Sequence, residues 1–202
     1  MKDFFEREIR SLDRIRTESW QDPRFYGQFL AQTYYYVCHT TRLLGLCASR
    51  IGVDREKLHH RFLKHAAEER SHHLLAERDL GKLGWKLAQL PELPTTAALY
   101  ETQYYRVEHL SPTSIFGYIL ALEGLSVLHG PYIHELVSRH HGDATSFVKV
   151  HAEDDPSHLD AAFEAVSALS EVETRLIEQN FVFSCHLYRL FLDGVGENRL
   201  TD

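Results

Sequence analysis

The sequence predicts an all-α protein that forms a single domain. Apolar residues recur at intervals of three and four along most of its 202 residues, the spacing that gives a helix one apolar face. No stretch shows the alternation of a half-buried strand or the turn of a β-hairpin. Proline- and glycine-containing breaks divide the helical segments, but no linker or long internal repeat separates a second domain. We therefore expect one bundle of seven or eight helices over residues 1–202.

The composition excludes several other classes of protein. A 44% apolar content over this length is sufficient for one substantial core, and a formal net charge of −7 argues against nucleic acid or an anionic membrane as a partner. The sequence shows neither a secretory signal pattern nor an apolar run of the ~18 residues that span a bilayer, so we expect a cytoplasmic protein. Cys38, Cys47 and Cys185 are odd in number and widely spaced, which favours reduced thiols over disulfides.

Helix boundaries follow from capping residues and from proline and glycine. An amphipathic helix is expected between residues 2 and 19, within an N-terminal segment 1–23 that ends at a proline. A second helix is expected from about 24 to 50, and a third from its N-cap Asp54 to the glycines at 81 and 84. The later helices are expected at 95–109, at 111–130 with a kink or break at Pro131 before a continuation to 141, across 151–158, and at 170–192 before a polar tail at 194–202.

Two segments carry the same pattern of metal-ligand residue types. The segment from His65 to His72 and the segment from His151 to His158 both read His-x3-acid-x2-His. With about 100° between successive residues of a helix, the three positions fall at roughly 0°, 40° and −20°. Each segment is therefore expected to place two imidazoles and a carboxylate on one narrow helix face.

A third helix offers one more carboxylate. Glu123 lies in the apolar run from Ile115 to Leu125, where an ionised carboxylate without a nearby cation is costly to bury. With the Glu-x2-His and Asp-x2-His pairs it forms a mixed oxygen and nitrogen set that suits two iron or manganese ions, and the absence of cysteine argues against structural zinc. The candidate metal ligands are Glu69, His72, Glu123, His151, Asp155 and His158.

Several assignments stay open from the sequence. Pro156 removes a backbone donor and disfavours helical geometry at Asp155, so we expect either an irregular helix there or a helix that ends at Asp155 and leaves His158 in the next one. His65 lies on the same face as Glu69 and is either a ligand or a group that supports a ligand. Four neighbouring groups point about 100° away and are expected in solvent or around the ligands: Glu68, His73, Glu153 and Asp154.

These segments resemble the helix signatures of a known family, the haem-oxygenase-like di-iron oxidases and oxygenases, also described as iron-containing redox enzymes. The resemblance covers about residues 25–193 and rests on 65–72 followed by 78–84, on 117–124 and on 151–158. It implies a haem-oxygenase-like helical bundle in which the six candidate residues divide between two irons, or iron and manganese, with bridging carboxylates. Some members place the first carboxylate seven residues before the first histidine. That position is His65 here, so only the Glu69 register is compatible.

The resemblance also implies an activity. Similar family members use two irons and O2 to oxidise small molecules, by decarboxylation or fragmentation of fatty acids and amino acids, by desaturation or by N-oxygenation. We therefore expect a non-haem di-iron oxidase or oxygenase with an amino-acid-like or fatty-acid-like substrate and, where the reaction needs one, an external electron donor. A long aromatic C-terminal helix also suggests a homodimer.

Three alternatives are compatible with the sequence. A metal-free thiamin-pyrimidine hydrolase on the same fold would need a nucleophilic cysteine with a nearby acid, for which Cys185 beside His186 is the candidate. A haem oxygenase would need one axial histidine and would leave the other ligand-type residues unexplained. A non-catalytic protein that stores or senses iron would bind the metal without consuming O2 faster when an organic substrate is added.

Two helices carry residues that are candidates for a substrate channel, although aromatic residues at this spacing more often belong to a core. Either Arg42 or Arg189 is suited to hold a substrate carboxylate by a bidentate ion pair. The candidate channel residues are Tyr34, Tyr35, Tyr36 and His39 in the second helix and Phe181, Phe183, His186, Tyr188 and Arg189 in the last.

Overall fold

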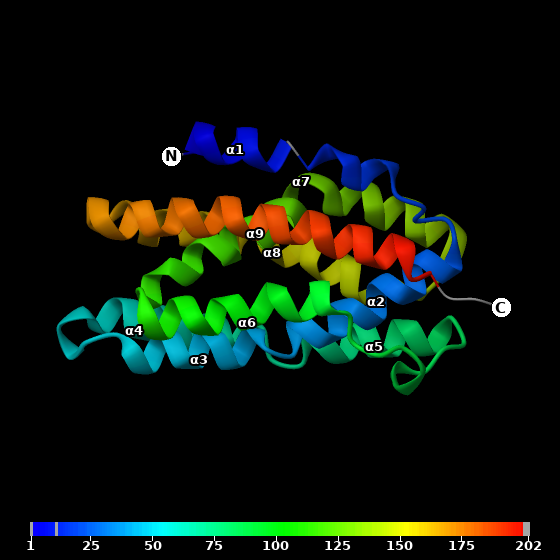
Figure 1. Cartoon of the computed structure of the whole chain (residues 1–202), viewed down its shortest axis with the longest axis horizontal. Helices are drawn as coiled ribbons and strands as arrows, with labels where there is room; N and C mark the ends of the chain where they lie inside the picture. The colour runs from blue at the N-terminus through cyan, green and yellow to red at the C-terminus, as the bar shows by residue number, and fades with distance from the viewer. Residues whose placement is uncertain (1, 11, 200–202) are drawn as a thin grey trace.

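The structure confirms an all-α protein. A computed structural model describes residues 2–10 and 12–199, and these residues form nine α-helices and four short 3-10 helices, with no strand among them (Figure 1). The α-helices are α1 (Lys2–Arg10), α2 (Pro23–Val37), α3 (Thr40–Arg50), α4 (Glu56–Glu68), α5 (His72–Lys82), α6 (Pro94–His109), α7 (Ile115–His141), α8 (Ser146–Ser167) and α9 (Glu171–Glu197). The 3-10 helices are η1 (Asp13–Thr17), η2 (Val53–Arg55), η3 (Leu87–Gln89) and η4 (Pro112–Ser114).

The helices form two layers that run along the long axis of the molecule (Figure 1). In one layer α7 packs against both α8 and α9. The other layer holds α2 to α6, in which α2 packs on α5 and α3 packs on α4. Contacts of α6 with α9 and of α5 with α8 join the layers, while α1 and η1 cover the outer side of the α7 layer. The two layers therefore enclose the interior in which the candidate ligands lie.

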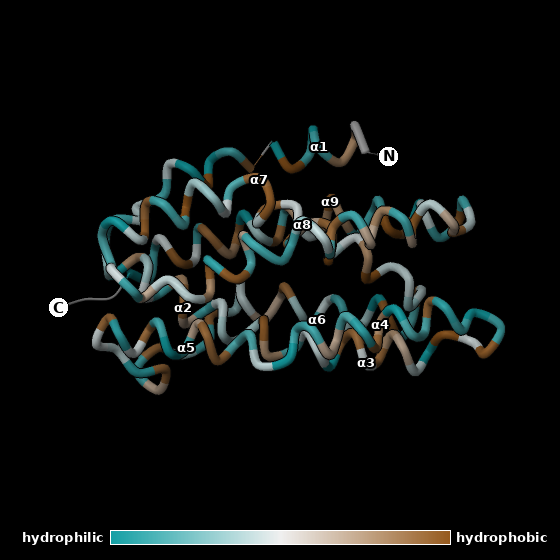
Figure 2. Tube along the Cα trace, turned by 180° about the vertical axis from the view of Figure 1, so that it is seen from behind, coloured by the Kyte–Doolittle hydropathy of each residue, from teal (hydrophilic) through white to brown (hydrophobic). Residues whose placement is uncertain are grey.

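Apolar residues are spread along the helices and are not gathered in one long segment (Figure 2). None of the helices in the described part of the chain combines the length and the apolarity that a membrane span requires. The apolar faces meet in a common core. Its largest side chains, each less than 2% exposed, include Trp20, Phe25, Phe62, Phe116, Phe181 and Phe191.

Two helices that the sequence predicted as continuous are each interrupted once, so that seven expected segments become nine α-helices in the described chain. The expected helix 24–50 breaks at His39, whose ring stacks on the Tyr100 ring of α6 with 3.8 Å between centroids. The expected helix 54–81 breaks between α4 and α5, where Ser71 has a left-handed backbone with a φ of 72°. A tertiary contact and one unusual backbone conformation thus override the helical periodicity.

Pro131 and Pro156 lie inside helices that continue through them, so a break at Pro131 and a helix that ends at Asp155 are both wrong. A proline removes only one backbone donor, and the long contact between α7 and α8 holds both helices in place around it. Gly130 permits the close approach of the two helices, because a Cβ at this position would lie 3.3 Å from the Ala152 side chain. Packing therefore outweighs the local preference of proline here.

Both ends of the chain also differ from the expectation. The N-terminal helix predicted at 2–19 is divided into α1 and η1, and Ser11 between them lies outside the described residues. The predicted polar tail at 194–202 is partly helical, because α9 continues to Glu197 and buries Gly194 and Val195. A Cβ on Gly194 would lie 2.5 Å from the Thr95 hydroxyl, so glycine lets α9 pack against the start of α6. Residues 200–202 lie outside the described part of the chain.

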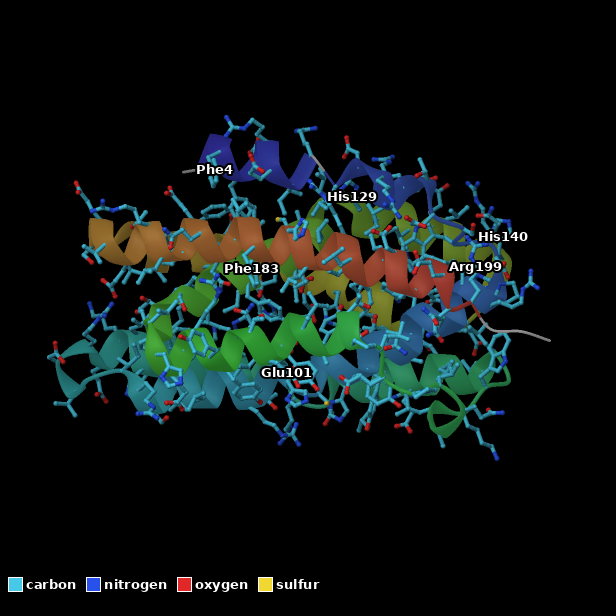
Figure 3. All side chains as sticks on the ribbon, in the orientation of Figure 1. Phe4, Glu101, His129, His140, Phe183 and Arg199 are labelled. Atoms are coloured by element: carbon cyan, nitrogen blue, oxygen red, sulfur yellow. The ribbon has the colours of Figure 1, made fainter. Side chains whose placement is uncertain are left out.

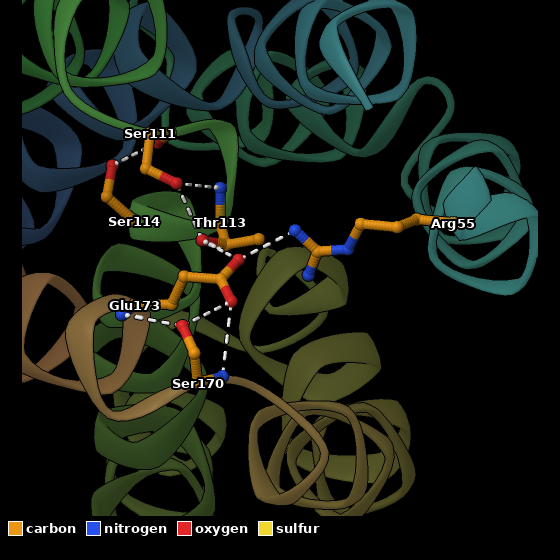
Figure 4. Close-up of polar contacts among 6 residues, drawn as sticks. All are labelled: Arg55, Ser111, Thr113, Ser114, Ser170 and Glu173. Carbon is orange, nitrogen blue, oxygen red and sulfur yellow. Dashed lines mark hydrogen bonds and ion pairs between the residues drawn. The ribbon is translucent and has the colours of Figure 1, made fainter. Parts of the chain in front are cut away.

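Glu173 joins the start of α9 to two other elements (Figure 4). Its carboxylate accepts hydrogen bonds from the Ser170 backbone N–H at 3.2 Å and from the Ser170 hydroxyl at 2.8 Å, and that hydroxyl accepts from the Glu173 N–H at 3.3 Å. This reciprocal capping box begins α9. The same carboxylate accepts from Arg55 in η2 at 2.7 Å and from Thr113 in η4 at 3.2 Å. One side chain therefore fixes α9 to both layers.

Asp79 on α5 anchors the start of α8. Its side chain is 0% exposed, and its carboxylate accepts hydrogen bonds from the Ser146 hydroxyl at 2.6 Å and from the Phe147 backbone N–H at 2.8 Å. These bonds satisfy donors in the first turn of α8 that have no partner within the helix. Asp79 thereby sets the position of α8, the helix that carries three of the candidate ligands.

Replacing Glu173 with alanine should lower the free energy of unfolding by about 1–2 kcal/mol, because the cap of α9 and the bonds to η2 and η4 are lost together. Chemical denaturation at pH 7 measures the difference. Glu171→Ala, in the same turn of α9 but outside this network, is the matched control and should change the free energy of unfolding by less than ~0.5 kcal/mol. Equal losses in both variants would contradict the role assigned to Glu173.

Replacing Asp79 with alanine should lower the free energy of unfolding by roughly 2–3 kcal/mol, because two donors at the start of α8 lose a charged acceptor in a buried place. Thermal and urea denaturation both report the effect. Asp143→Ala is the control, since the Asp143 side chain is 88% exposed and its ion pair with Lys82 is at the surface. A native-like stability for Asp79→Ala would show that α8 does not depend on this anchor.

Candidate metal centre

The ligand-type residues predicted from the sequence converge inside the bundle, where α4, α5, α7 and α8 meet. All six candidate ligands lie there, together with His65. They form three overlapping groups in which the ligand-type atoms lie within 4.8 Å of one another: Glu69, His72 and His151; Glu69, Asp155 and His158; and His65, Glu123 and His158. Glu69 and His158 each belong to two of the groups, and of these two side chains only the Glu69 carboxylate offers two oxygens that could bind separate ions.

The first group lies where α4 ends and α5 begins. Glu69 Oε2 is 3.1 Å from His72 Nδ1, and the His72 ring centroid is 5.0 Å from that of His151. The His151 Nδ1–H donates a hydrogen bond to the Phe147 carbonyl at 2.8 Å. This bond selects the tautomer of the neutral ring in which Nε2 carries a free lone pair, so His151 is oriented as a metal ligand is.

The other two groups connect α4, α7 and α8. His65 Nε2 is 3.1 Å from Glu123 Oε1 and 3.6 Å from Glu69 Oε1. His158 Nδ1 is 3.7 Å from Glu69 Oε1 and 3.7 Å from Asp155 Oδ1. One oxygen of Glu69 thus faces His65 and His158, while the other faces His72. This single carboxylate therefore connects the first group with the histidines of the other two.

The backbone between α4 and α5 positions Glu69. Its N–H still bonds to the His65 carbonyl at 3.0 Å, but Ser71 then adopts the left-handed conformation and redirects the chain before His72. A non-glycine residue in this conformation costs on the order of 1–3 kcal/mol. The two segments of equal sequence pattern therefore differ in geometry, because the ligands from 151 to 158 share one face of the continuous helix α8.

The carboxylates of this site are almost completely buried. Glu69 and Glu123 are 7% exposed, Asp155 is 3% exposed, and their close ion pairs are with histidines. Several polar atoms make no hydrogen bond of ordinary geometry, namely both ring nitrogens of His65, Nδ1 of His72 and of His158, and Oε2 of Glu123. Unpaired groups of this kind are costly to bury. Divalent cations would compensate the negative charges and occupy these lone pairs, so the residues fit a metal centre.

In the metal-free protein, protons on the histidines balance the buried carboxylates. Burial lowers the pKa of His65, but the contacts with Glu123 and Glu69 outweigh it and raise this pKa to about 9. Burial also opposes the ionisation of Glu69, yet its contacts with His65 and His72 hold its pKa well below the usual range. For Glu123, burial is the stronger influence and raises the pKa. Metal binding would therefore release protons from this site.

His65 is a site residue that the sequence left undecided. The signal for it was the repeated pattern, since His65 holds the same place in its segment as His151 does in the other. Of the four neighbouring groups, Glu68 contacts a candidate ligand from the solvent side. Its Oε2 lies 3.7 Å from His158 Nε2, and 38% of its side chain is exposed. The other three neighbours, His73, Glu153 and Asp154, are absent from the candidate ligand groups.

A cavity of about 120 Å³ adjoins the candidate ligands. One part of its wall is formed by His65, Glu69, Glu123, His151 and Asp155. Most of the remaining wall is apolar and includes Ile15, Phe29, Ile119, Leu125, Ile133 and Val148. Three buried tyrosines complete it, namely Tyr36, Tyr118 and Tyr188, and burial raises the pKa of each phenol above its usual range, so all three stay neutral.

The cavity corrects the predicted substrate channel. Of the candidate channel residues, Tyr36 and Tyr188 line the cavity. Those that do not line it are Tyr34, Tyr35, His39, Phe181, Phe183, His186 and Arg189, and the second candidate anchor, Arg42, is also absent from its wall. Phe183, for example, lies between α9 and α6 (Figure 3), where the Arg106 guanidinium is 4.8 Å from its ring centroid. Helical periodicity identified buried faces but could not say which of them border a cavity.

A comparison with models of known families assigns the chain to one of them. A family model described as iron-containing redox enzyme matches residues 27–188, a range that includes every candidate ligand. The chain belongs to the iron-containing redox enzyme family. Membership in this family, together with the candidate metal groups, indicates an oxidoreductase that uses iron. No curated protein matches the sequence.

Solved structures share the fold of this iron-containing redox enzyme. A domain of unknown function with a haem oxygenase-like fold from Shewanella denitrificans OS217 superposes with a TM-score of 0.84 at 19% identity, covering 95% of this chain and 90% of that one. A TenA homologue from Pseudomonas syringae pv. tomato DC3000 has a TM-score of 0.75 at 15% identity, covering 90% and 86%. A TenA homologue from Pyrococcus furiosus has a TM-score of 0.69 at 13% identity, covering 95% and 99%. The predicted haem-oxygenase-like fold is confirmed.

The metal-free protein should lose stability as the pH rises from 7 to 9. The pKa of His65 is about 9 in the folded protein against an ordinary value of 6.5, so its proton stabilises the fold fully below about pH 6.5, and this contribution is lost as the pH rises through about 9. His65→Gln removes this contribution and should flatten the pH dependence.

Urea denaturation of the metal-free protein at several pH values between 6 and 9.5 tests this expectation. His60→Gln is the matched control, because His60 is an exposed histidine on the same helix. An alkaline loss of stability that is the same in native protein and His65→Gln would contradict the expectation.

Proposed function

We propose that this protein is a non-haem di-iron oxidase or oxygenase that uses O2 to oxidise a small organic substrate of amino-acid-like or fatty-acid-like type. The observation that carries the proposal is the overlap of three ligand groups at one edge of a mainly apolar cavity. Ligand-type residues and a mainly apolar cavity are thus neighbours in the same interior. Membership in the iron-containing redox enzyme family supports iron as the metal.

Two ions suit this site better than one ion. Glu69, His72 and His151 form one ligand group, Glu123 and His158 belong to another, and Glu69 and Asp155 lie in the group between them. Imidazole and carboxylate ligands suit iron, and manganese in one position is compatible with them. Bound irons would supply electrons for the reduction of O2, a redox chemistry that the side chains of the site do not provide.

The cavity wall defines what the protein itself does for a substrate. Its apolar part excludes water and would pack against an apolar portion of the substrate, so that the reacting end lies at the ligand-lined part. The Tyr118 hydroxyl is buried without a hydrogen-bond partner and is available to bind a polar substrate atom. Among the described residues that line the cavity there is no lysine or arginine, so neither Arg42 nor Arg189 is proposed as a carboxylate anchor.

An external electron donor belongs to this proposal. Where the oxidation of the substrate supplies fewer electrons than the full reduction of O2 to water requires, a donor must provide the remainder. The side chains of His72 and His158 are 14% and 11% exposed, so electrons would enter most directly through these partly exposed histidines.

The metal-free hydrolase is less well supported by the site. Its candidate nucleophile, Cys185, is 3% exposed, and burial raises the pKa of its thiol to about 12. None of Cys38, Cys47 and Cys185 is among the residues that line the cavity. A neutral, enclosed thiol is a poor nucleophile. A haem oxygenase would use one axial histidine, whereas four histidines converge here.

Anaerobic reconstitution with Fe(II) should load two irons per chain, and O2 consumption should then rise when a substrate is added. Glu123→Ala and His158→Ala should each lose at least one iron, because each removes a ligand from the group that the two residues share. Metal analysis after desalting and an oxygen electrode provide the two measurements. Candidate substrates are medium-sized fatty acids and apolar amino acids.

His73→Ala is the matched control, since His73 follows His72 directly but lies outside the ligand groups, and it should keep both irons. Failure of the native protein to bind iron would overturn the proposal and bring the metal-free alternatives forward. Iron binding without any substrate-dependent O2 consumption would instead favour a protein that stores or senses iron.

A further inference from the structure

The two histidine-rich segments pair in opposite order across the site. His65, the first histidine of its segment, lies with its ring 4.9 Å from that of His158, the last of the other segment. His72, the last of its segment, lies 5.0 Å from His151, the first of the other. The middle acids of both segments belong to the group that lies between these pairs. Two equivalent positions thus arise, each flanked by one histidine from each segment.

The burial of His65 has no explanation in ordinary hydrogen bonding. The residue is 3% exposed, and neither ring nitrogen makes a hydrogen bond of ordinary geometry. His59 on the same helix is bonded to the Ala48 carbonyl at 2.8 Å, whereas the buried His129 on α7 also lacks a hydrogen bond at both ring nitrogens. The Nε2 atom of His65 instead lies 3.1 Å from Glu123, whose second carboxylate oxygen is also unpaired. A shared cation would satisfy both groups.

We propose that His65 is a direct metal ligand, bound to the same ion as Glu123 and His158. This inference rests on the proposed di-iron function and adds a seventh protein ligand to the six predicted from the sequence. The centre then contains four imidazoles and three carboxylates, with two imidazoles for each ion. One segment is broken at Ser71 and the other is a continuous helix. Each ion would nevertheless receive one imidazole from each segment.

The additional imidazole has a consequence for metal choice. Imidazole ligands favour iron over manganese more than carboxylates do, since manganese prefers oxygen donors. His65 therefore biases its position towards iron. A glutamate at this position would offer an oxygen donor and should shift the preference towards manganese.

Proton NMR of the Co(II)-reconstituted protein counts the histidine ligands. Each metal-bound imidazole whose second nitrogen carries a proton gives one exchangeable, strongly shifted resonance. The native protein should show four such resonances, and His65→Gln should show three, or two if the ion beside it is lost as well. His60→Gln, an exposed change on the same helix, should keep all four. Circular dichroism verifies that each variant is folded.

The outcomes separate this inference from the proposed function. A native protein that binds no metal would overturn both. A native protein that binds two ions but shows three exchangeable resonances, or a folded His65→Gln variant that keeps four, would overturn the inference and leave the di-iron function standing. Because the native protein alone gives a decisive count, the test does not depend on the folding of the variant.

A competition experiment supplies a second measurement. Equal concentrations of Fe(II) and Mn(II) are offered anaerobically to native protein and to His65→Glu, and the bound metals are quantified after desalting. The ratio of bound iron to bound manganese should fall in the variant, because a carboxylate oxygen replaces an imidazole nitrogen at the affected position. An unchanged ratio would contradict direct ligation by His65.

Discussion

The burial of three carboxylates among histidines is the constraint on which the rest of this structure depends. Glu69, Glu123 and Asp155 lie inside a bundle whose other interior contacts are largely apolar, where uncompensated charge is costly. In the metal-free protein, protons on the surrounding imidazoles compensate this negative charge. In the loaded protein, on our proposal, metal ions bound by the imidazoles and carboxylates compensate it. The helices that carry these groups must therefore be held at defined positions, because a carboxylate left without its partners would destabilise the fold.

Two different devices hold the helices at those positions. The start of α8 is fixed by the buried carboxylate of Asp79, and its contact with α7 keeps it helical through Pro156. The α4–α5 segment is instead broken, and the left-handed backbone at Ser71 lets Glu69 face two ligand groups at once. Strain of this kind persists only where surrounding contacts enforce it, and here it coincides with the candidate centre.

The fold alone does not determine the chemistry of this family. Structures with less than 20% identity share the helical bundle, including homologues of TenA, so function has to be argued from the site. In this chain the interior offers a ligand-lined edge, a mainly apolar wall and neutral phenols, while its three cysteines lie elsewhere. That combination suits metal-dependent oxidation of a partly apolar molecule better than attack by a thiol.

The sequence by itself determined the all-α class and the set of ligand-type residues, because helical periodicity and the His-x3-acid-x2-His spacing are local properties of the chain. Glu123 was identifiable for the same reason, as a lone carboxylate in an apolar run. Only the tertiary structure decided where the helices break, that the chain stays helical at Pro156, that His65 joins Glu123 and His158, and which tyrosines border the cavity. These features depend on contacts between segments that are distant in sequence, and no local spacing encodes which faces will meet.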